Sequence, residues 1–191
     1  MTTFNPKETN TFHYFTFVTF LRVPIFHSEQ ICRFLIEALQ ETKTDLPFKL
    51  VAYVIMPDHV HLIINPLQCN IVIIGKTLKG KSARKILDWL KETGHMRSLT
   101  KLKRMNPKKR NHSYSVWQKG VKSVGLESHK FMRQKADYVH LNPVRAGLCD
   151  HPGKWKWSSY GGYLRHLPKA LPMEIDKQPF WTNEELKAVG R

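Results

Sequence analysis

The sequence predicts an α+β sandwich of the ferredoxin-like kind, with the element order β-α-β-β-α-β and a C-terminal extension. Three observations support this prediction. Short runs of β-branched and aromatic residues are typical of strands, and they alternate with longer segments whose apolar residues recur at helical spacing. A chain of 191 residues can bury one sizeable hydrophobic core but seldom divides into two. Internal repeats and low-complexity tracts are absent from the sequence.

The first half of the chain predicts three strands and one helix. Residues 13–21 and 48–56, HYFTFVTFL and FKLVAYVIM, are short, apolar and rich in aromatic or β-branched side chains, and residues 60–65, VHLIIN, repeat that pattern. Ser28 is a suitable N-cap for the helical segment that follows it, EQICRFLIEALQETK. A Pro-Asp pair between the second and third strands provides turn chemistry.

The second half predicts two helices and one strand. Residues 77–92 carry lysine and arginine on one side of a helix and leucine and isoleucine on another. A strand is predicted over residues 115–121, after a basic loop. The last helix is predicted over residues 128–141, closed by the Asn-Pro pair that follows it and by Gly147.

Composition predicts one soluble cytoplasmic domain over residues 1–165, followed by a tail over residues 166–191 whose role the sequence does not indicate. Charge or proline interrupts every apolar stretch well short of the ~20 residues that a membrane span requires. The N-terminal sequence MTTFNPKETN lacks the basic and then apolar pattern of a signal peptide. We therefore expect no membrane partner.

Basic charge is concentrated in one quarter of the chain. The formal net charge is +16 and the sequence pI is near 9.9. Residues 1–75 hold five basic and six acidic side chains, residues 76–122 hold fifteen and two, and residues 123–191 hold eleven and seven. Within the middle part, residues 97–112 carry seven lysines or arginines and no acid. Such a segment is either a solvated loop or, as we favour, a binding surface for nucleic acid phosphates.

Residues 75–82, GKTLKGKS, fit the P-loop pattern of nucleotide-binding proteins and follow an apolar run. A P-loop enzyme also needs a parallel α/β sheet and an acidic residue at the end of a later buried strand, which binds magnesium. Neither feature is found after Ser82. We therefore interpret the match as fortuitous and this segment as a basic helix face, although an NTPase stays a remote alternative.

His59 and His61 are separated by one residue in a strand-like run, VAYVIMPDHVHLIIN. Alternate side chains of a strand lie on the same face, so the two imidazoles are placed side by side and can bind one divalent cation. Two histidines do not complete a metal site. A pair of histidines on the solvated face of the strand explains the pattern equally well.

Tyr138 and Asn142 are four residues apart in ADYVHLNPVRAGL, so a helix places them on one face. A tyrosine hydroxyl can be a covalent nucleophile when a metal or a base activates it. An asparagine carbonyl is a suitable hard oxygen ligand for Mg²⁺ or Mn²⁺. Periodicity alone favours a plainer interpretation, in which Tyr138 lies in the core and Asn142 caps the helix before Pro143.

Three motifs, in this order, resemble those of the single-tyrosine HUH transposases, and within them the REP-associated tyrosine transposases of the IS200-like family. They are MPDHVHLII around the histidine pair, YVHLNPVRAGL around the tyrosine, and WKWSSYGGYL from Trp155. The resemblance covers residues 12–165, and NPVRAGL is its most distinctive part.

The resemblance implies the palm fold of HUH endonucleases and a nuclease that cuts and rejoins single-stranded or hairpin DNA. Tyr138 matches the nucleophile of the family, which forms a 5′-phosphotyrosine and leaves a free 3′-hydroxyl. His59, His61 and Asn142 match the ligands of the divalent metal, Mg²⁺ or Mn²⁺. A protein of the same fold that binds DNA without cutting it, or that has been domesticated, is the alternative.

The resemblance also bears on DNA contacts and assembly. Insertion-sequence relatives act as dimers with the tyrosine supplied in trans, whereas the REP-associated branch resembles monomers. We therefore expect a monomer, with a homodimer as the alternative. Six side chains of the basic segment are candidates for phosphate contacts: Lys101, Lys103, Arg104, Lys108, Lys109 and Arg110.

Overall fold

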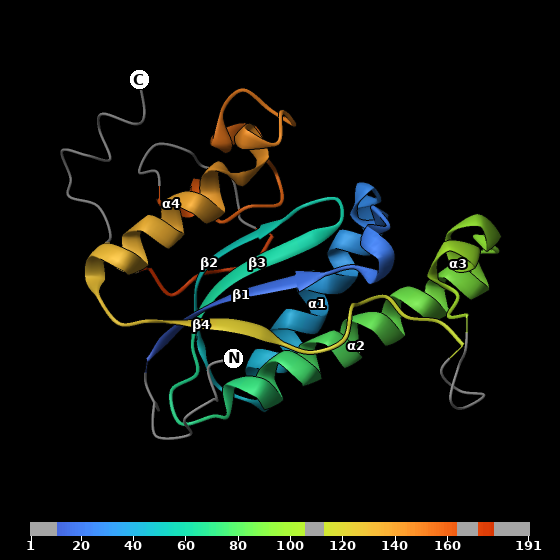
Figure 1. The fold of residues 1–191 in the computed structure, drawn as a ribbon, viewed down its shortest axis with the longest axis horizontal. Coiled ribbons are helices and arrows are strands. Elements are labelled where there is room, and N and C mark those ends of the chain that lie inside the picture. Colours follow the sequence, from blue (N-terminus) through green and yellow to red (C-terminus); the bar gives the residue numbers. More distant parts are fainter. Residues whose placement is uncertain (1–10, 106–112, 164–171, 178–191) are drawn as a thin grey trace.

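The computed structural model describes residues 11–105, 113–163 and 172–177. Its central layer is one four-stranded sheet with helices on both faces (Figure 1). The prediction of an α+β fold is thereby confirmed. The elements are β1 (Phe12–Val18), α1 (Glu29–Asp45), β2 (Lys49–Ile55), β3 (His59–Asn65), α2 (Ile71–Glu92), α3 (Met96–Leu102), β4 (Lys122–Leu126), α4 (His129–Arg145) and α5 (Tyr160–Tyr163), with short 3₁₀ turns η1 (Phe20–Arg22), η2 (Ile25–His27) and η4 (Pro152–Lys154).

The strands follow the order β2-β3-β1-β4, and every neighbouring pair is antiparallel. β3 thus lies between β1 and β2, which is the split β-α-β arrangement expected for this element order. Thr16 of β1 pairs with His61 of β3, and Val18 pairs with His59. This register brings one end of β1 alongside the histidine pair.

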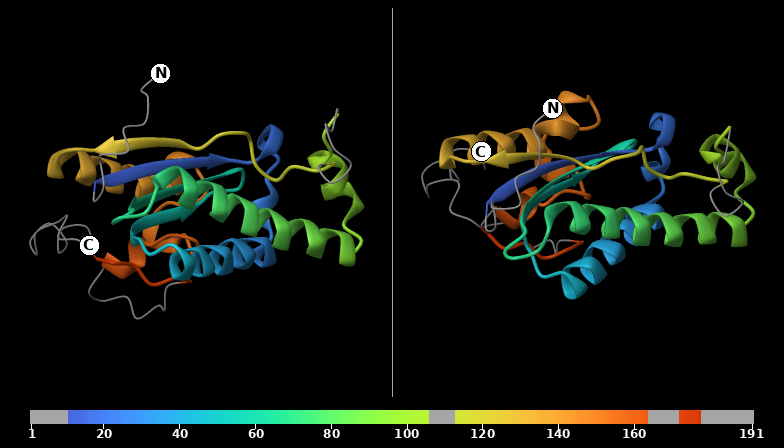
Figure 2. Two further views of the ribbon diagram at one scale, coloured as in Figure 1. Left: turned by 90° about the horizontal axis from the view of Figure 1, so that it is seen from below. Right: turned by 60° about the horizontal axis from the view of Figure 1, so that its bottom comes forward.

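Helices cover the two faces of the sheet unequally. Figures 1 and 2 show α1 and α2 side by side on one face and α4 on the other. The alternation of β3 separates two hydrophobic clusters accordingly. Val60, Leu62 and Ile64 face α1 and α2, whereas Ile63 packs with Met132 and Val139 towards α4. No helix in the described part of the chain is long and apolar enough to cross a membrane.

The last strand of the sheet lies later in the chain than predicted. Residues 115–121 contain only an isolated bridge, between Thr19 and Trp117, and β4 begins at Lys122. The apolar signal in this segment comes from core packing of irregular backbone, since the indole of Trp117 lies 5.5 Å from the ring of Phe26. Gly120, at φ +79°, turns the chain before the edge strand begins.

The segment with the P-loop pattern is helical throughout. Residues 71–74, the apolar run before it, form the first turn of α2 rather than a strand, and Asn70 caps that turn. Gly75 through Ser82 continue the same helix, so no phosphate-binding loop exists there. The Ser82 hydroxyl donates to the Leu78 carbonyl and accepts from the Trp117 indole. The interpretation of this match as fortuitous is confirmed.

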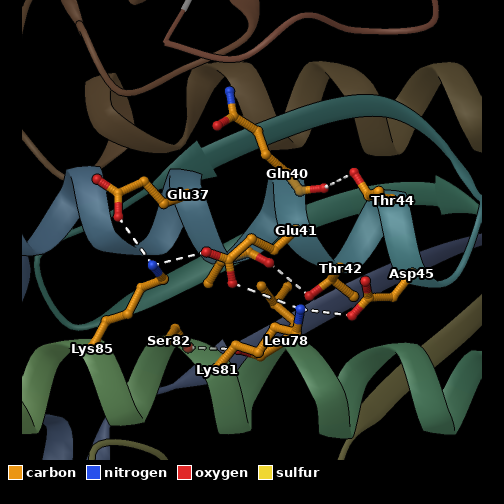
Figure 3. Close-up of polar contacts among 11 residues, drawn as sticks. Glu37, Gln40, Glu41, Thr42, Thr44, Asp45, Leu78, Lys81, Ser82 and Lys85 are labelled. Atoms are coloured by element: carbon orange, nitrogen blue, oxygen red, sulfur yellow. Dashed lines mark hydrogen bonds and ion pairs between the residues drawn. The ribbon is translucent and has the colours of Figure 1, made fainter.

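Much of the basic charge on α2 is neutralised within the protein. Lys81 lies 2.7 Å from Asp45, and Lys85 lies 2.8 Å from Glu41, both on α1 (Figure 3). Lys79 donates instead to the backbone carbonyls of Gln118 and Gly120. The prediction that this helix presents a basic face is therefore correct only in part, because these three lysines bind α1 and the segment before β4.

The predicted end of the last helix was one turn too early. α4 continues through Pro143 to Arg145. The Gly147 N–H donates to the Val144 carbonyl and the Leu148 N–H to the Pro143 carbonyl, which is the Schellman pattern. Gly147 has φ +68°, which a side chain would disfavour. Asn142 therefore lies inside the helix and does not cap it.

Residues 155–159 and 172–177 pack along the outer edge of β2. The Ile55 N–H donates to the Trp157 carbonyl, and the Trp155 indole donates to the Ile55 carbonyl. Met173 is buried in the core, and Asp176 accepts from the Leu50 N–H. These contacts satisfy backbone groups of β2 that the sheet itself leaves open.

The two glycines of α2 provide a test of the helical assignment. A Cβ at Gly80 would meet nothing within 4 Å, whereas at Gly75 it would meet Val121 Cγ1 at 2.8 Å. Gly80→Ala is expected to raise the free energy of unfolding by about 1 kcal/mol, because alanine favours the helix over glycine. Gly75→Ala is the matched control and should gain less or lose stability. Urea denaturation measures both, and a Gly80→Ala protein less stable than wild type would contradict the assignment.

Candidate functional site

The histidine pair lies on the face of the sheet that α4 covers. His59 and His61 are the first and third residues of β3, so strand alternation places them on one face. The centroids of the two imidazole rings are 4.8 Å apart. The side-by-side arrangement predicted from the spacing is therefore present in the structure.

His59 is oriented by a carboxylate. Its Nδ1 lies 2.6 Å from Oδ1 of Asp58, and the other oxygen of that carboxylate lies 2.8 Å from Arg22. Burial raises the pKa of Asp58, but the hydrogen bonds from His59 and Arg22 outweigh it and lower the pKa overall. Because a carboxylate only accepts, Nδ1 of His59 carries the hydrogen and Nε2 is the nitrogen available to a metal.

A strained turn holds this carboxylate in place. The backbone N–H and the hydroxyl of Thr19 both donate to the Asp58 carbonyl, each at 2.9 Å. Leu21 and Arg22 follow with φ of 51° and 55°, a left-handed conformation that ordinary side chains seldom adopt. Such conformations persist only where surrounding contacts fix them, and here they bring Arg22 to Asp58.

His61 is buried and held by two hydroxyl groups of β1. Its Nδ1 lies 2.7 Å from the Tyr14 hydroxyl and 3.1 Å from the Thr16 hydroxyl. Its Nε2 is buried with no hydrogen-bond partner in the described chain. The single hydrogen of the neutral ring is best placed on Nδ1, where oxygens can accept it, which leaves a lone pair on Nε2.

The buried setting of His61 keeps both its imidazole and the Tyr14 hydroxyl neutral. Burial lowers the pKa of His61 to about 3, and the electrostatic interaction with the neighbouring His59 adds to this shift. Burial likewise raises the pKa of Tyr14 to about 12, and Tyr14 stacks on the His61 ring at 5.2 Å. A neutral imidazole with a free lone pair is the form that binds a divalent metal.

Tyr138 of α4 joins the histidine pair. The centroid of its ring is 5.5 Å from that of His61 and 6.2 Å from that of Tyr14. Its side chain is 37% exposed, in contrast to the buried residues around it. The prediction from periodicity that Tyr138 belongs to the core is therefore wrong, because Tyr138 reaches solvent beside the buried imidazole of His61.

A buried histidine fixes the rotation of α4 about its own axis. Nε2 of His140 lies 2.8 Å from the hydroxyl of Ser159, and that hydroxyl accepts from the Tyr53 N–H of β2. Burial lowers the pKa of His140 to about 3, so this contact is made by a neutral ring. The link couples the WKWSSYGGYL segment to the helix that carries Tyr138.

The third predicted ligand, Asn142, belongs to α4, whereas both histidines belong to β3. Asn142 lies one turn after Tyr138 on the same helix and is 8% exposed. Among the described residues no group of three histidine, cysteine, aspartate or glutamate side chains could hold a metal ion. Imidazole nitrogens and an amide oxygen are suitable donors for a divalent ion, and α4, which carries Asn142, packs on the face of the sheet that carries the two histidines.

The predicted phosphate contacts that the structure describes lie away from this site. Lys101 and Lys103 are exposed and Arg104 is half-buried, in or directly after α3. In Figures 1 and 2 α3 stands at the far end of α2, away from α4. The other three candidates fall outside the described residues: Lys108, Lys109 and Arg110.

Several residues of the site were not predicted from the sequence. Tyr14 and Thr16 approach His61 from β1, and Asp58 and Arg22 approach His59 from two turns. The alternation of β1 places Tyr14 and Thr16 on one face of the sheet. A single sequence does not indicate, however, that β1 pairs with β3. Asp58 directly precedes His59 in the sequence, and this adjacency was the one sequence signal that could have indicated its contact with the imidazole.

Comparison with known proteins identifies the class and then the family. Residues 9–142 match the family model described as "Transposase IS200 like", so the chain is a transposase by class and belongs to the IS200-like family. A protein of Haemophilus influenzae named as a REP-associated tyrosine transposase is 25% identical over 180 residues, which cover 93% of this chain and 92% of that protein.

A solved structure shares the fold. It is a REP-associated tyrosine transposase bound to a REP hairpin, with a TM-score of 0.62 and 18% identity. The match covers 93% of this chain and 94% of that one. At this identity the likeness concerns the fold, and it extends from the sheet through the C-terminal segments.

The two buried neutral histidines predict a pH-dependent stability. Unfolding restores the ordinary pKa of His61 and His140. Below about pH 6.5 both histidines are therefore protonated in the unfolded chain, whereas in the folded chain they stay neutral until the pH approaches 3. Between pH 6.5 and pH 5 each histidine should lower the free energy of unfolding by about 2 kcal/mol. Urea denaturation in EDTA measures this fall. His140→Gln should remove about half of it, and an unchanged pH dependence in that variant would refute the assignment.

Proposed function

We propose that this protein cuts and rejoins single-stranded DNA at a hairpin, with Tyr138 as the nucleophile and Mg²⁺ or Mn²⁺ as the cofactor. The observation that carries the proposal is the position of Tyr138. Its partly exposed ring lies 5.5 Å from a buried imidazole whose Nε2 has no protein partner in the described chain. Membership of a transposase family supports a reaction on DNA, and the fold shared with a protein bound to a REP hairpin supports that substrate.

The proposed reaction is a transesterification at one phosphodiester. The Tyr138 hydroxyl oxygen bonds to phosphorus as the bond from phosphorus to the 3′-oxygen breaks. The phenolic proton passes to solvent, and the departing 3′-oxygen takes up a proton from water. The downstream strand stays on Tyr138 as a 5′-phosphotyrosine, and attack by a 3′-hydroxyl of another strand reverses the step. Because the phosphoester is conserved, rejoining requires no ATP.

His59, His61 and Asn142 are the proposed metal ligands. The bound ion would supply Lewis-acid polarisation of the phosphate, which compensates for the weak nucleophilicity of a phenol at neutral pH. Asp58 and Tyr14 would orient the two imidazoles through Nδ1, as hydrogen-bonded oxygens commonly do for metal-binding histidines. Burial lowers the pKa of His61 and keeps that ring neutral, while the partly exposed Tyr138 is open to the strand.

We further propose that the protein acts as a monomer. The ring of Tyr138 lies beside His61 of the same chain, so nucleophile and histidine pair meet without a second copy. A dimer with the tyrosine supplied in trans would require α4 to leave the face of the sheet on which it packs.

The nucleophile is tested by covalent trapping. Purified protein with Mn²⁺ and a 3′-labelled REP hairpin carrying single-stranded flanks should give an adduct that survives denaturing electrophoresis. Tyr138→Phe should abolish the adduct, and His59→Ala and His61→Ala should each reduce the rate by at least about 100-fold. Tyr114→Phe, away from the histidine pair, is the matched control and should react as wild type.

An undiminished adduct in Tyr138→Phe would overturn the mechanism. Hairpin binding by wild type with no adduct under either metal would favour the alternative of a DNA-binding protein that does not cut.

The carboxylate behind His59 provides a second test. Asp58→Asn keeps the shape of the side chain but loses the charge that orients Nδ1 of His59. Its affinity for Mn²⁺ should fall about 10- to 100-fold, as expected when the partner of a metal-binding histidine is lost. Calorimetric titration measures this without DNA. Asp150→Asn removes an exposed carboxylate paired with Lys154 and should bind Mn²⁺ as wild type; equal affinities for both variants would exclude the role of Asp58.

A further inference from the structure

We propose that Lys135 and Arg145 form a phosphate-binding site on either side of Tyr138 along α4, and that this site receives the phosphodiester under attack. The inference deepens the proposed function and rests on it. It assigns the positive charge of the site to two residues outside the basic segment that the sequence emphasises.

The spacing of residues along α4 places one cation on each side of Tyr138. Lys135, Tyr138, Asn142 and Arg145 follow one another at intervals of three, four and three residues. These intervals place all four on one stripe of an α-helix. The nucleophile and the proposed amide ligand are thus flanked by one cation on each side. The Schellman turn after Arg145 fixes the end of that stripe.

Both cations lie close to the proposed nucleophile. Nζ of Lys135 lies 5.6 Å from the centre of the Tyr138 ring, and Cζ of Arg145 lies 5.4 Å from it. Lys135 also lies 5.1 Å from the Tyr14 ring and 5.4 Å from the Phe131 ring. The lysine therefore sits among aromatic rings next to His61, and its charge lies close enough to that imidazole to oppose its protonation.

Both cations lack a counter-ion among the described residues. Neither Lys135 nor Arg145 pairs with a carboxylate in the described part of the chain, and the contacts of both are to aromatic rings. Eight other cations in the described part of the chain do have an acidic partner within 4 Å: Arg22, Arg33, Lys43, Lys81, Lys85, Lys91, Lys154 and Lys156. Two cations beside a nucleophile with no such partner are available to an external anion.

The chemistry of the reaction identifies that anion. Attack by a tyrosine oxygen on a phosphodiester increases the negative charge on the non-bridging oxygens, and cations fixed in advance stabilise that charge most strongly. Arg145 can also hold two oxygens at once through its guanidinium fork, which fixes the orientation of the phosphate. Lys135, on the other side, supplies a point charge within a partly dehydrated aromatic setting.

The experiment compares binding with chemistry in matched variants. Lys135→Ala and Arg145→Ala are each mixed with a 3′-labelled REP hairpin at saturating protein and Mn²⁺, and the adduct is followed in a single turnover. Each variant should slow adduct formation about 10- to 100-fold. Lys135→Arg and Arg145→Lys should recover part of the rate. Lys130→Ala removes a cation from the same helix that makes no contact with the Tyr138 ring, and should keep the wild-type rate.

A modified strand locates the contact. Once the wild-type adduct has mapped the cleaved position, that phosphate alone is replaced by an uncharged methylphosphonate, and affinity is measured in the Tyr138→Phe background. Lys135→Ala and Arg145→Ala should weaken binding of the unmodified hairpin and have no further effect on the modified one. Equal losses on both strands, or single-turnover rates equal to that of Lys130→Ala, would overturn the inference.

A different experimental result would show that the proposed cleavage reaction itself is wrong. If wild type forms no adduct with any metal, the cleavage reaction is excluded, and hairpin binding in EDTA still tests the phosphate site. Each alanine variant should then reduce the slope of log affinity against log salt concentration by about 0.7, the value for one lost contact to single-stranded DNA. Slopes identical to that of Lys130→Ala would reject the site.

Discussion

The packing of α4 against the sheet is the contact on which the site depends. The histidines belong to β3 and the tyrosine to α4, so their proximity exists only while this helix lies on this face at one rotation. Met132, Ala136 and Val139 bury one stripe of α4 against the sheet. His140 adds a directional contact by bonding to Ser159, which is itself bonded to β2. Since adjacent helical residues are about 100° apart, a rotation by one position would carry Tyr138 away from His61.

The two basic side chains beside Tyr138 do not lie where the sequence has its largest basic excess. The quarter of the chain with the largest basic excess includes α2, and there Lys81 and Lys85 pair with acids of α1 while Lys79 holds a loop. These cations stabilise the layer behind the sheet. On the face of the sheet that α4 covers, two cations lie beside the Tyr138 ring, and both come from a part of the chain with a modest net charge. The largest basic excess along the sequence therefore does not include these two cations.

The sequence predicts the elements well because each carries its own periodicity. The histidine spacing also specifies a shared face, since alternation in a strand is a local property. Long-range pairing has no such signal: nothing local indicates that Tyr14 and Thr16 of β1 meet His61. Residues 115–121 resemble a strand because Val116 and Trp117 are apolar, but those side chains fill the core from irregular backbone. Pro143 predicted an early helix end, whereas the Schellman turn ends α4 one turn later.

Neutral and charged groups are separated by depth in this site, and the separation has a physical cause. Charging a buried imidazole is unfavourable, so His61 contributes a lone pair and no charge. A cation at the same depth would need a counter-ion to offset its lost hydration, and that counter-ion would repel DNA. Lys135 and Arg145 avoid both penalties because they sit at the more accessible rim, against aromatic faces that attract cations without carrying negative charge. Tyr138 lies between these levels, where its ring packs beside the buried imidazole of His61 while the residue stays partly exposed to solvent.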